Sequence, residues 1–184
     1  MKLIEKIKLI AGQFALNKDL KKKTVRRMPK DFSKVKTVGI VYVVPSERDF
    51  KIISSFVKFF QDQNKNVKAL GFTNSDMVPH FCFPKLTYDY YTKKDLNWYN
   101  KPSSNFVDDF IKNEYDLMID LTTSFEFSTR YIAYNSKSLF KVGKMNDKNL
   151  VHYDLLLDVT DDISLHDYTD HIKHYLTHIN IKNE

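Results

Sequence analysis

Cysteine and glycine, the residues that most often mark disulfides and phosphate-binding loops, are scarce in this sequence. Cys82 is the only cysteine, which excludes an intramolecular disulfide. It lies between Phe81 and Phe83, and this apolar setting predicts a buried structural thiol rather than a reactive one. The chain has only four glycines, which form neither a GxGxxG nor a GxxxxGKS/T pattern, so the two common phosphate-loop motifs are excluded.

Long hydrophobic runs are also missing. No stretch approaches the roughly 20 apolar residues of a membrane-spanning helix. Glu5, Lys6 and Lys8 interrupt the apolar start of the chain, which is not typical of a secretory signal. We therefore expect a cytoplasmic protein. Its 184 residues are the size of one domain with its own core.

Positive charge is concentrated at the N-terminus. Residues 1–36 hold twelve Lys and Arg against three acidic residues, a net charge of +9, whereas the remainder holds seventeen basic and twenty acidic residues, a net charge of −3. We therefore divide the chain into a basic N-terminal arm, 1–34, and an α/β domain, 35–184. Such asymmetry indicates an arm that seeks an anionic surface. The alternative is a leader that packs one face on the body and keeps its lysines in water.

Within the arm, four apolar residues recur at helical spacing and predict an amphipathic helix over 2–16. These residues, called the apolar stripe below, are Leu3, Ile7, Ile10 and Phe14. Pro29 prevents the helix from continuing through the basic residues that follow. The candidate phosphate contacts in that following segment are Lys21, Lys22, Lys23, Arg26, Arg27 and Lys30.

The body alternates strands and helices, which predicts one doubly wound, mostly parallel, Rossmann-like sheet with helices on both faces. The strands are expected at 37–44, 67–72, 86–91, 116–121, 140–143 and 153–159. Those at 37–44 and 116–121 lack polar alternation, so we place them in the interior of the sheet. The helices are expected after Ser46, at 105–113, at 125–134 with Ser124 as a cap, and after Ser164.

In such sheets, ligands bind beyond the carboxyl ends of the strands. The polar residues at those ends, which form a possible ligand cleft, are Ser46, Asp120, Thr122, Thr123 and Arg130. The hydroxyls before the helix at 125–134 could receive an anion, or Thr123 or Ser124 could simply cap that helix. Asp120 could act as a general base or could bond to loop amides. Both alternatives stay open at this point.

Two further patterns suggest ligands. His171, His174 and His178 share one stripe of the last helix, but the stripe lies away from the apolar face, so we expect a solvated face and no metal site. Residues 93–101 interleave lysines with Trp98, as single-stranded nucleic-acid sites do. The same aromatic residues could instead cover an edge of the core.

Two resemblances add to this interpretation. The run YDLMIDLTTSFEFSTRYIAYNSKSLFKVG, 115–143, resembles the N-terminal half of heptosyltransferase-type glycosyltransferases, which implies a Rossmann-like half-fold. The nucleotide-sugar domain of those enzymes has no counterpart here, so the resemblance implies no activity. Over most of 36–176, the segments TVGIVYV, NVKALGF, KKDLNWYNKP, YDLMIDLT and RYIAYNSKSLFKVG together resemble a small uncharacterised family of Bacteroidetes-type bacteria.

Three functions remain open. The first is a non-enzymatic binding protein whose basic arm docks on RNA or a ribonucleoprotein, and we place it first because no coherent catalytic set is visible. The second is a small enzyme or sensor that binds a phosphorylated or nucleotide ligand in the cleft. The third is a peripheral membrane protein whose N-terminal helix lies on anionic lipid. No cofactor is expected.

Overall fold

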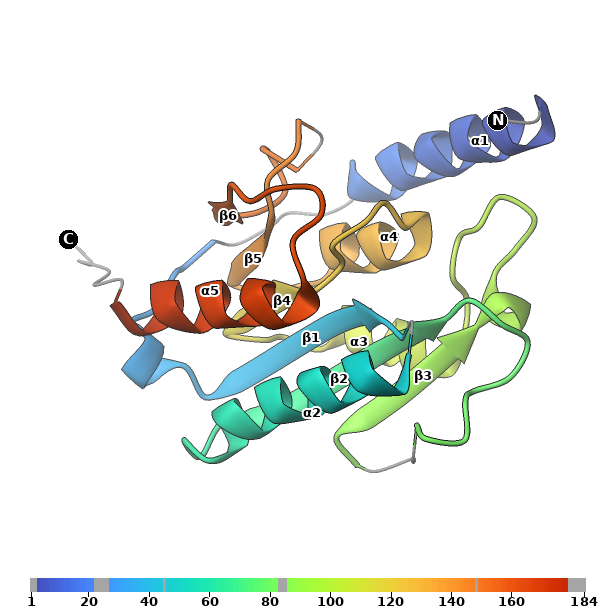
Figure 1. Ribbon diagram of the computed structural model, residues 1–184. Helices are drawn as coiled ribbons and strands as arrows, with labels where there is room; N and C mark the ends of the chain where they lie inside the picture. Colours follow the sequence, from blue (N-terminus) through green and yellow to red (C-terminus); the bar gives the residue numbers. More distant parts are fainter. Residues whose placement is uncertain (1–2, 22–26, 45, 83–85, 148, 179–184) are drawn as a thin grey trace.

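A computed structural model describes residues 3–21, 27–44, 46–82, 86–147 and 149–178. The described chain forms one six-stranded sheet in the order β3-β2-β1-β4-β5-β6, with every neighbouring pair parallel (Figure 1). This confirms the predicted doubly wound, Rossmann-like fold. The sheet grows outward from β1 in both directions, so the chain reverses its direction of growth between β1 and β4.

The strands are short, and they fall close to the predicted segments. They are β1 (Thr37–Val43), β2 (Asn66–Thr73), β3 (Tyr88–Thr92), β4 (Leu117–Asp120), β5 (Phe140–Lys144) and β6 (Leu155–Leu157). β1 and β4 are the two central strands, and Ile40 pairs in register with Ile119. Both isoleucines are fully buried, which confirms that these two strands are interior.

Helices cover both faces of the sheet. They are α1 (Leu3–Leu20), α2 (Glu47–Gln61), α3 (Asn105–Lys112), α4 (Phe127–Asn135) and α5 (Leu165–His178). α2 and α5 contribute to one apolar core, and α1, α3 and α4 contribute to the other. α1 forms an outer layer on α4, away from the sheet (Figure 1).

Helix starts follow the expected capping chemistry with one exception. Ser46 accepts a hydrogen bond from the Asp49 backbone amide at the start of α2, as predicted. The predicted cap of α4 by Thr123 or Ser124 is wrong. α4 begins at Phe127, and its cap is Glu126. Glu126 directly precedes the helix, and its carboxylate accepts a hydrogen bond from the Ser128 amide. Thr123 and Ser124 therefore lie outside the helix and do not cap it.

The region before α3 has one strand, β3, as expected, and then a loop. In that loop Trp98 is 60% exposed, whereas Tyr99 lies against α1. Cys82 is buried, and its burial raises the pKa of the thiol to about 11, in agreement with the predicted structural role. In the described part of the chain, no helix is long and apolar enough to cross a bilayer.

Candidate functional site

A pocket of about 500 Å³, called the strand-end pocket below, lies where β4 and β5 end. Its walls come from the segment between β4 and α4, from α4 itself, from the turn after β5 and from Asp161. Four of the five predicted cleft residues line it, namely Asp120, Thr122, Thr123 and Arg130. The fifth, Ser46, does not line this pocket, because it caps α2 at the end of a different strand.

Asp120 is the buried acid of the pocket. The Tyr153 hydroxyl donates to its Oδ2 at 2.5 Å, and the Thr122 backbone amide donates to its Oδ1 at 2.9 Å. Burial raises the pKa of the Asp120 carboxyl, while the hydrogen bonds from Thr122 and Tyr153 and the charge of Arg130 oppose that rise. Asp120 therefore bonds to a loop amide, as one alternative predicted, and it also faces the pocket.

Lys144 connects two walls of the pocket by hydrogen bonds. Its Nζ donates to the Thr123 carbonyl at 3.3 Å, to the Thr160 carbonyl at 3.0 Å and to Asp161 Oδ1 at 3.1 Å. These contacts join the segment after β4 to the loop after β6. Because three acceptors already surround the nearly buried ammonium, Lys144 acts first as a structural cross-link.

Arg130 is a second cation that lines the pocket. Its guanidinium lies over the Phe125 ring, with 4.1 Å between the Cζ atom and the ring centroid. No salt bridge to Arg130 occurs among the described residues. Arg130 is close enough to Asp120 and to His152 for its charge to lower the pKa of both groups. Arg130 therefore lines the pocket without forming an ion pair in the described chain.

The N-terminus of α4 is occupied by its own chain. Glu126 Oε1 accepts hydrogen bonds from the Ser128 amide at 3.1 Å and from the Ser128 hydroxyl at 2.9 Å. A carboxylate thus already sits where an incoming anion was considered from the sequence. The hydroxyls of Thr122 and Thr123 line the pocket without serving as caps of α4.

The turn after β5 supplies a wall that the sequence reasoning missed. It contributes Met145, Asn146, Asp147 and Asn149, which follow Lys144 at the end of β5. Asn149 is fixed on both sides, by the Tyr134 hydroxyl at 2.6 Å and by the Lys144 carbonyl at 2.7 Å. The sequence contained one signal for this wall, namely the end of the strand predicted at 140–143. Parallel strands end at the same edge of the sheet, so the residues after this strand could have been placed near those after β4.

The structure describes three of the six predicted phosphate contacts, namely Lys21, Arg27 and Lys30. Lys21 is exposed after the end of α1, while Lys22, Lys23 and Arg26 lie outside the described residues. Arg27 binds Asp154 Oδ2 at 2.6 Å and the His152 carbonyl at 3.0 Å. Lys30 binds Asp116 Oδ1 at 2.5 Å. These last two cations are therefore neutralised by the body.

α1 is fixed to the body by one narrow face. Gly12 and Leu16 are its buried residues. A Cβ placed on Gly12 would lie 2.8 Å from the Tyr99 carbonyl oxygen and 2.8 Å from Phe127 Cζ, so only glycine permits this approach. Asp19 adds a polar anchor, because its Oδ2 accepts from Lys101 Nζ at 2.8 Å and from the Tyr131 hydroxyl at 2.5 Å.

α1 packs one face on the body, as the leader alternative described, but that face is not the apolar stripe. The members of the apolar stripe are Leu3, Ile7, Ile10 and Phe14, which are 74%, 50%, 71% and 73% exposed. At about 100° per residue they fall within an arc of about 60°, on the side of α1 opposite Gly12 and Leu16. The apolar stripe therefore points away from the protein.

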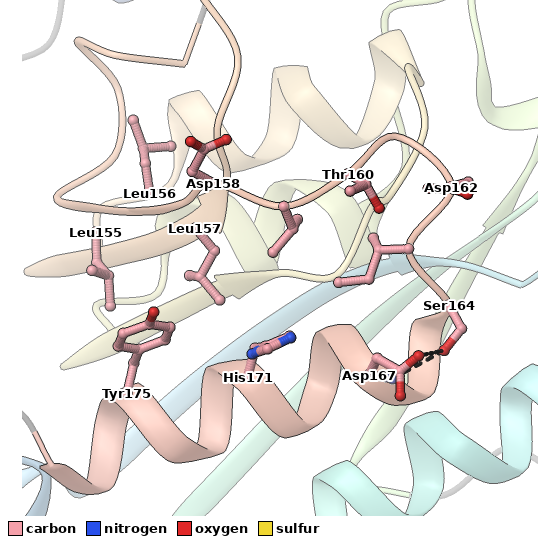
Figure 2. A pocket seen from close by; sticks show the side chains of 12 residues that line it. Leu155, Leu156, Leu157, Asp158, Thr160, Asp162, Ser164, Asp167, His171 and Tyr175 are labelled. Atoms are coloured by element: carbon pink, nitrogen blue, oxygen red, sulfur yellow. Dashed lines mark hydrogen bonds between the residues drawn. The ribbon is translucent and has the colours of Figure 1, made fainter.

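A second cavity, of about 750 Å³, lies between β6 and α5 (Figure 2). Leu155 and Leu157 line it from the strand, and His171 and Tyr175 line it from the helix. The other predicted histidines, His174 and His178, stack on each other with 4.4 Å between ring centroids on the exposed side of α5. Within the described residues, no three His, Cys, Asp or Glu side chains are grouped to hold a metal ion.

Comparison with known proteins gives a family but no activity. Neither the curated proteins nor the solved structures contain a match to the chain. The resemblance of 115–143 to glycosyltransferases thus finds no support in these comparisons, whereas the expectation of an uncharacterised family is confirmed. The chain belongs to the family of unknown function DUF6913, which matches residues 8–179.

Proposed function

We propose that this protein docks through α1 on an anionic membrane surface. One observation carries the proposal: the apolar stripe is exposed along α1 and points away from the body. Soluble monomers rarely leave such a contiguous apolar patch in water, and a patch of this kind marks an interaction site. A helix with an apolar face and basic flanks is suited to lie in the plane of a lipid interface.

The charges around the apolar stripe favour anionic lipid. At about 100° per residue, Lys6 and Lys18 lie on the two sides of the apolar stripe. Lys21 follows the end of α1 and falls in line with the apolar stripe by the same angle. All three are exposed and unpaired among the described residues. Each lysine near an anionic leaflet contributes about 1 kcal/mol of attraction. The proposal places the protein at the inner leaflet of a bacterial membrane. This leaflet faces the cytoplasm, where the sequence analysis expected the protein.

RNA, the partner placed first from the sequence, explains less of this surface. Phosphate contacts use cations and have no need of an exposed Leu3, Ile7, Ile10 and Phe14. Two of the cations assigned to RNA, Arg27 and Lys30, already pair with Asp154 and Asp116. Lipid makes use of both the apolar stripe and the lysines, and for this reason we favour it.

Self-association through α1 is the other competing occupant. The spacing of the apolar stripe is that of a coiled-coil seam, but it extends over only about two heptads, fewer than the three or four that such a seam needs. Lys6 and Gln13 would take the flanking positions at which paired helices use opposite charges. Neither residue is an acid, so two copies would gain no pair of opposite charges across the seam.

The test is sedimentation of the full chain with lipid vesicles of two compositions, one neutral and one with about a third of anionic lipid. We expect binding to the anionic vesicles and much weaker binding to the neutral ones. Replacing Ile10 and Phe14 with Ser should abolish binding. Replacing Lys6, Lys18 and Lys21 with Gln should weaken binding about 100-fold, because three lysines contribute about 3 kcal/mol.

Matched controls use exposed residues elsewhere. Met77→Ser and Val151→Ser remove exposed apolar groups, and Lys93→Gln, Lys94→Gln and Lys112→Gln remove exposed charges. These variants should bind as the unchanged protein does. The proposal fails if single-stranded RNA binds more tightly than vesicles and Phe14→Ser leaves that binding intact. It also fails if the unchanged protein is a dimer in solution that does not bind vesicles, and Phe14→Ser converts this dimer into a monomer.

A further inference from the structure

We propose that the strand-end pocket binds a small zwitterion of the amino-acid type, a molecule that carries both a carboxylate and an amino group. This inference concerns a different part of the molecule from α1 and stands apart from membrane docking. It rests on the pocket between β4 and β5 and on the two kinds of unpaired charge that line it. The volume, about 500 Å³, falls in the range of small-molecule sites.

Arg130 is the group that would receive the carboxylate. The guanidinium has five N–H donors in one plane, which match the two oxygens of a carboxylate. The Phe125 ring lies under this guanidinium, with 4.1 Å between the Arg130 Cζ atom and the ring centroid. No acid of the described chain forms an ion pair with Arg130, although the buried Asp120 carboxyl lies near enough for the Arg130 charge to lower its pKa.

The amino group would be received by the acidic residues of the pocket, first of all by Asp147. Asp147 is exposed at the turn after β5 and forms no ion pair in the described chain. No salt bridge joins it to Arg130, although both line the same pocket. A cation and an anion that face one cavity without meeting leave room for a ligand that carries both opposite charges.

A phosphate, the ligand considered from the sequence, fits this pocket poorly. Among the described residues, four carboxylates and two cations line the cavity, so a dianion would meet net repulsion from these groups. These groups are Asp120, Glu126, Asp147 and Asp161, with Arg130 and Lys144. Of the two cations, Lys144 is occupied by Thr123, Thr160 and Asp161. The amide end of α4 is filled by Glu126 as well.

The floor of the pocket adds hydrogen-bonding groups in fixed positions. Asp120 is held by Tyr153 and Thr122, and Asn149 is held by Tyr134 and the Lys144 carbonyl. Groups fixed in this way lose little conformational freedom when a ligand binds. The floor is therefore preorganised, and the two unpaired charges belong to its wall and mouth.

The test is a thermal melt of the full chain with each of the twenty common amino acids at about 10 mM. A ligand present at 100 times its Kd should raise Tm by roughly 5–10 °C. Two analogues probe the zwitterion directly, namely the N-acetylated form and the decarboxylated amine of the best amino acid. Each should bind at least ten-fold more weakly than the amino acid itself, and inorganic phosphate should give no shift.

Variants locate the site. Arg130→Gln and Asp147→Asn should each weaken binding at least ten-fold in a calorimetric titration, while the melting temperature of the free protein stays close to that of the unchanged chain. Arg48→Gln and Asp76→Asn replace exposed residues of the same types elsewhere and should bind normally. The inference is overturned if no amino acid shifts Tm, if phosphate does, or if Arg130→Gln binds as tightly as before.

Discussion

Replacing Tyr153 with Phe should destabilise the protein more at high pH than at low pH. The Tyr153 hydroxyl donates to the Asp120 carboxylate at 2.5 Å in a buried site. The ring itself is held against Gly143, where a Cβ would lie 2.5 Å from Cε1, so Phe keeps the packing and leaves no cavity. The variant therefore removes one hydrogen bond and little else.

The size of the effect follows from the charge on Asp120. A hydrogen bond to a charged group contributes about 1.5–3 kcal/mol, so Tm should fall by roughly 3–12 °C at pH 8. Burial already raises the pKa of Asp120 in the folded state. Between the unfolded pKa and this raised value the folded state binds more protons, so the carboxyl's contribution to stability falls as pH rises through that window.

Without the Tyr153 hydroxyl the folded pKa of Asp120 should rise further, because a donor to the charged form is lost. The cost of Tyr153→Phe should thus be greatest above the folded pKa of Asp120 and should decrease as the pH falls through it. Urea denaturation over a series of pH values from 8 downward measures this change. A cost that stays the same over the whole series, or in the Asp120→Asn background, would refute the assigned hydrogen bond and its charge.

Two further predictions concern other parts of the molecule. Gly12→Ala should release α1 although alanine favours helices by about 1 kcal/mol, because its Cβ would meet Tyr99 and Phe127 at 2.8 Å; hydrogen exchange should then accelerate in α1 and stay slow in β1. His152 has its pKa lowered to about 4, first by burial and then by the charges of Lys141, Arg27 and Arg130, so its imidazole should be neutral when folded; in an NMR titration its ring signals should move near pH 4, and movement near 6.5 would contradict this environment.

The sheet was predictable because its strands carry their own signal. The segments containing Ile40 and Ile119 are continuously apolar, and strands buried on both faces have this composition. Lys141 shows the limit of such reasoning. It is almost fully buried in β5, where its Nζ binds the Ala133 carbonyl at 2.8 Å and the Tyr134 carbonyl at 3.1 Å at the end of α4. A strand pattern cannot indicate that a lysine will bind the end of a neighbouring helix.

The face by which α1 packs could not be found from periodicity either. The periodicity of the apolar stripe predicts that this face of α1 packs on a partner. The residues that contact the body are instead Gly12 and Leu16, on the opposite face. Glycine carries no hydrophobic signal, and its suitability depends on Tyr99 and Phe127, which are distant in sequence. Similarly, the pocket residue Asp147 lies in a turn without a motif, and only the sheet order brings it to the same pocket as Arg130.

The docking of α1 also has a consequence for synthesis on the ribosome. α1 is made before the groups that hold it, Tyr99, Phe127 and Tyr131, which follow roughly 80–110 residues later. At about 5–20 residues per second, α1 leaves the ribosome on the order of 10 s before its place on α4 exists. During that interval both the face of Leu16 and the apolar stripe are uncovered, so a membrane or a chaperone can meet the helix before the domain that will hold it has folded.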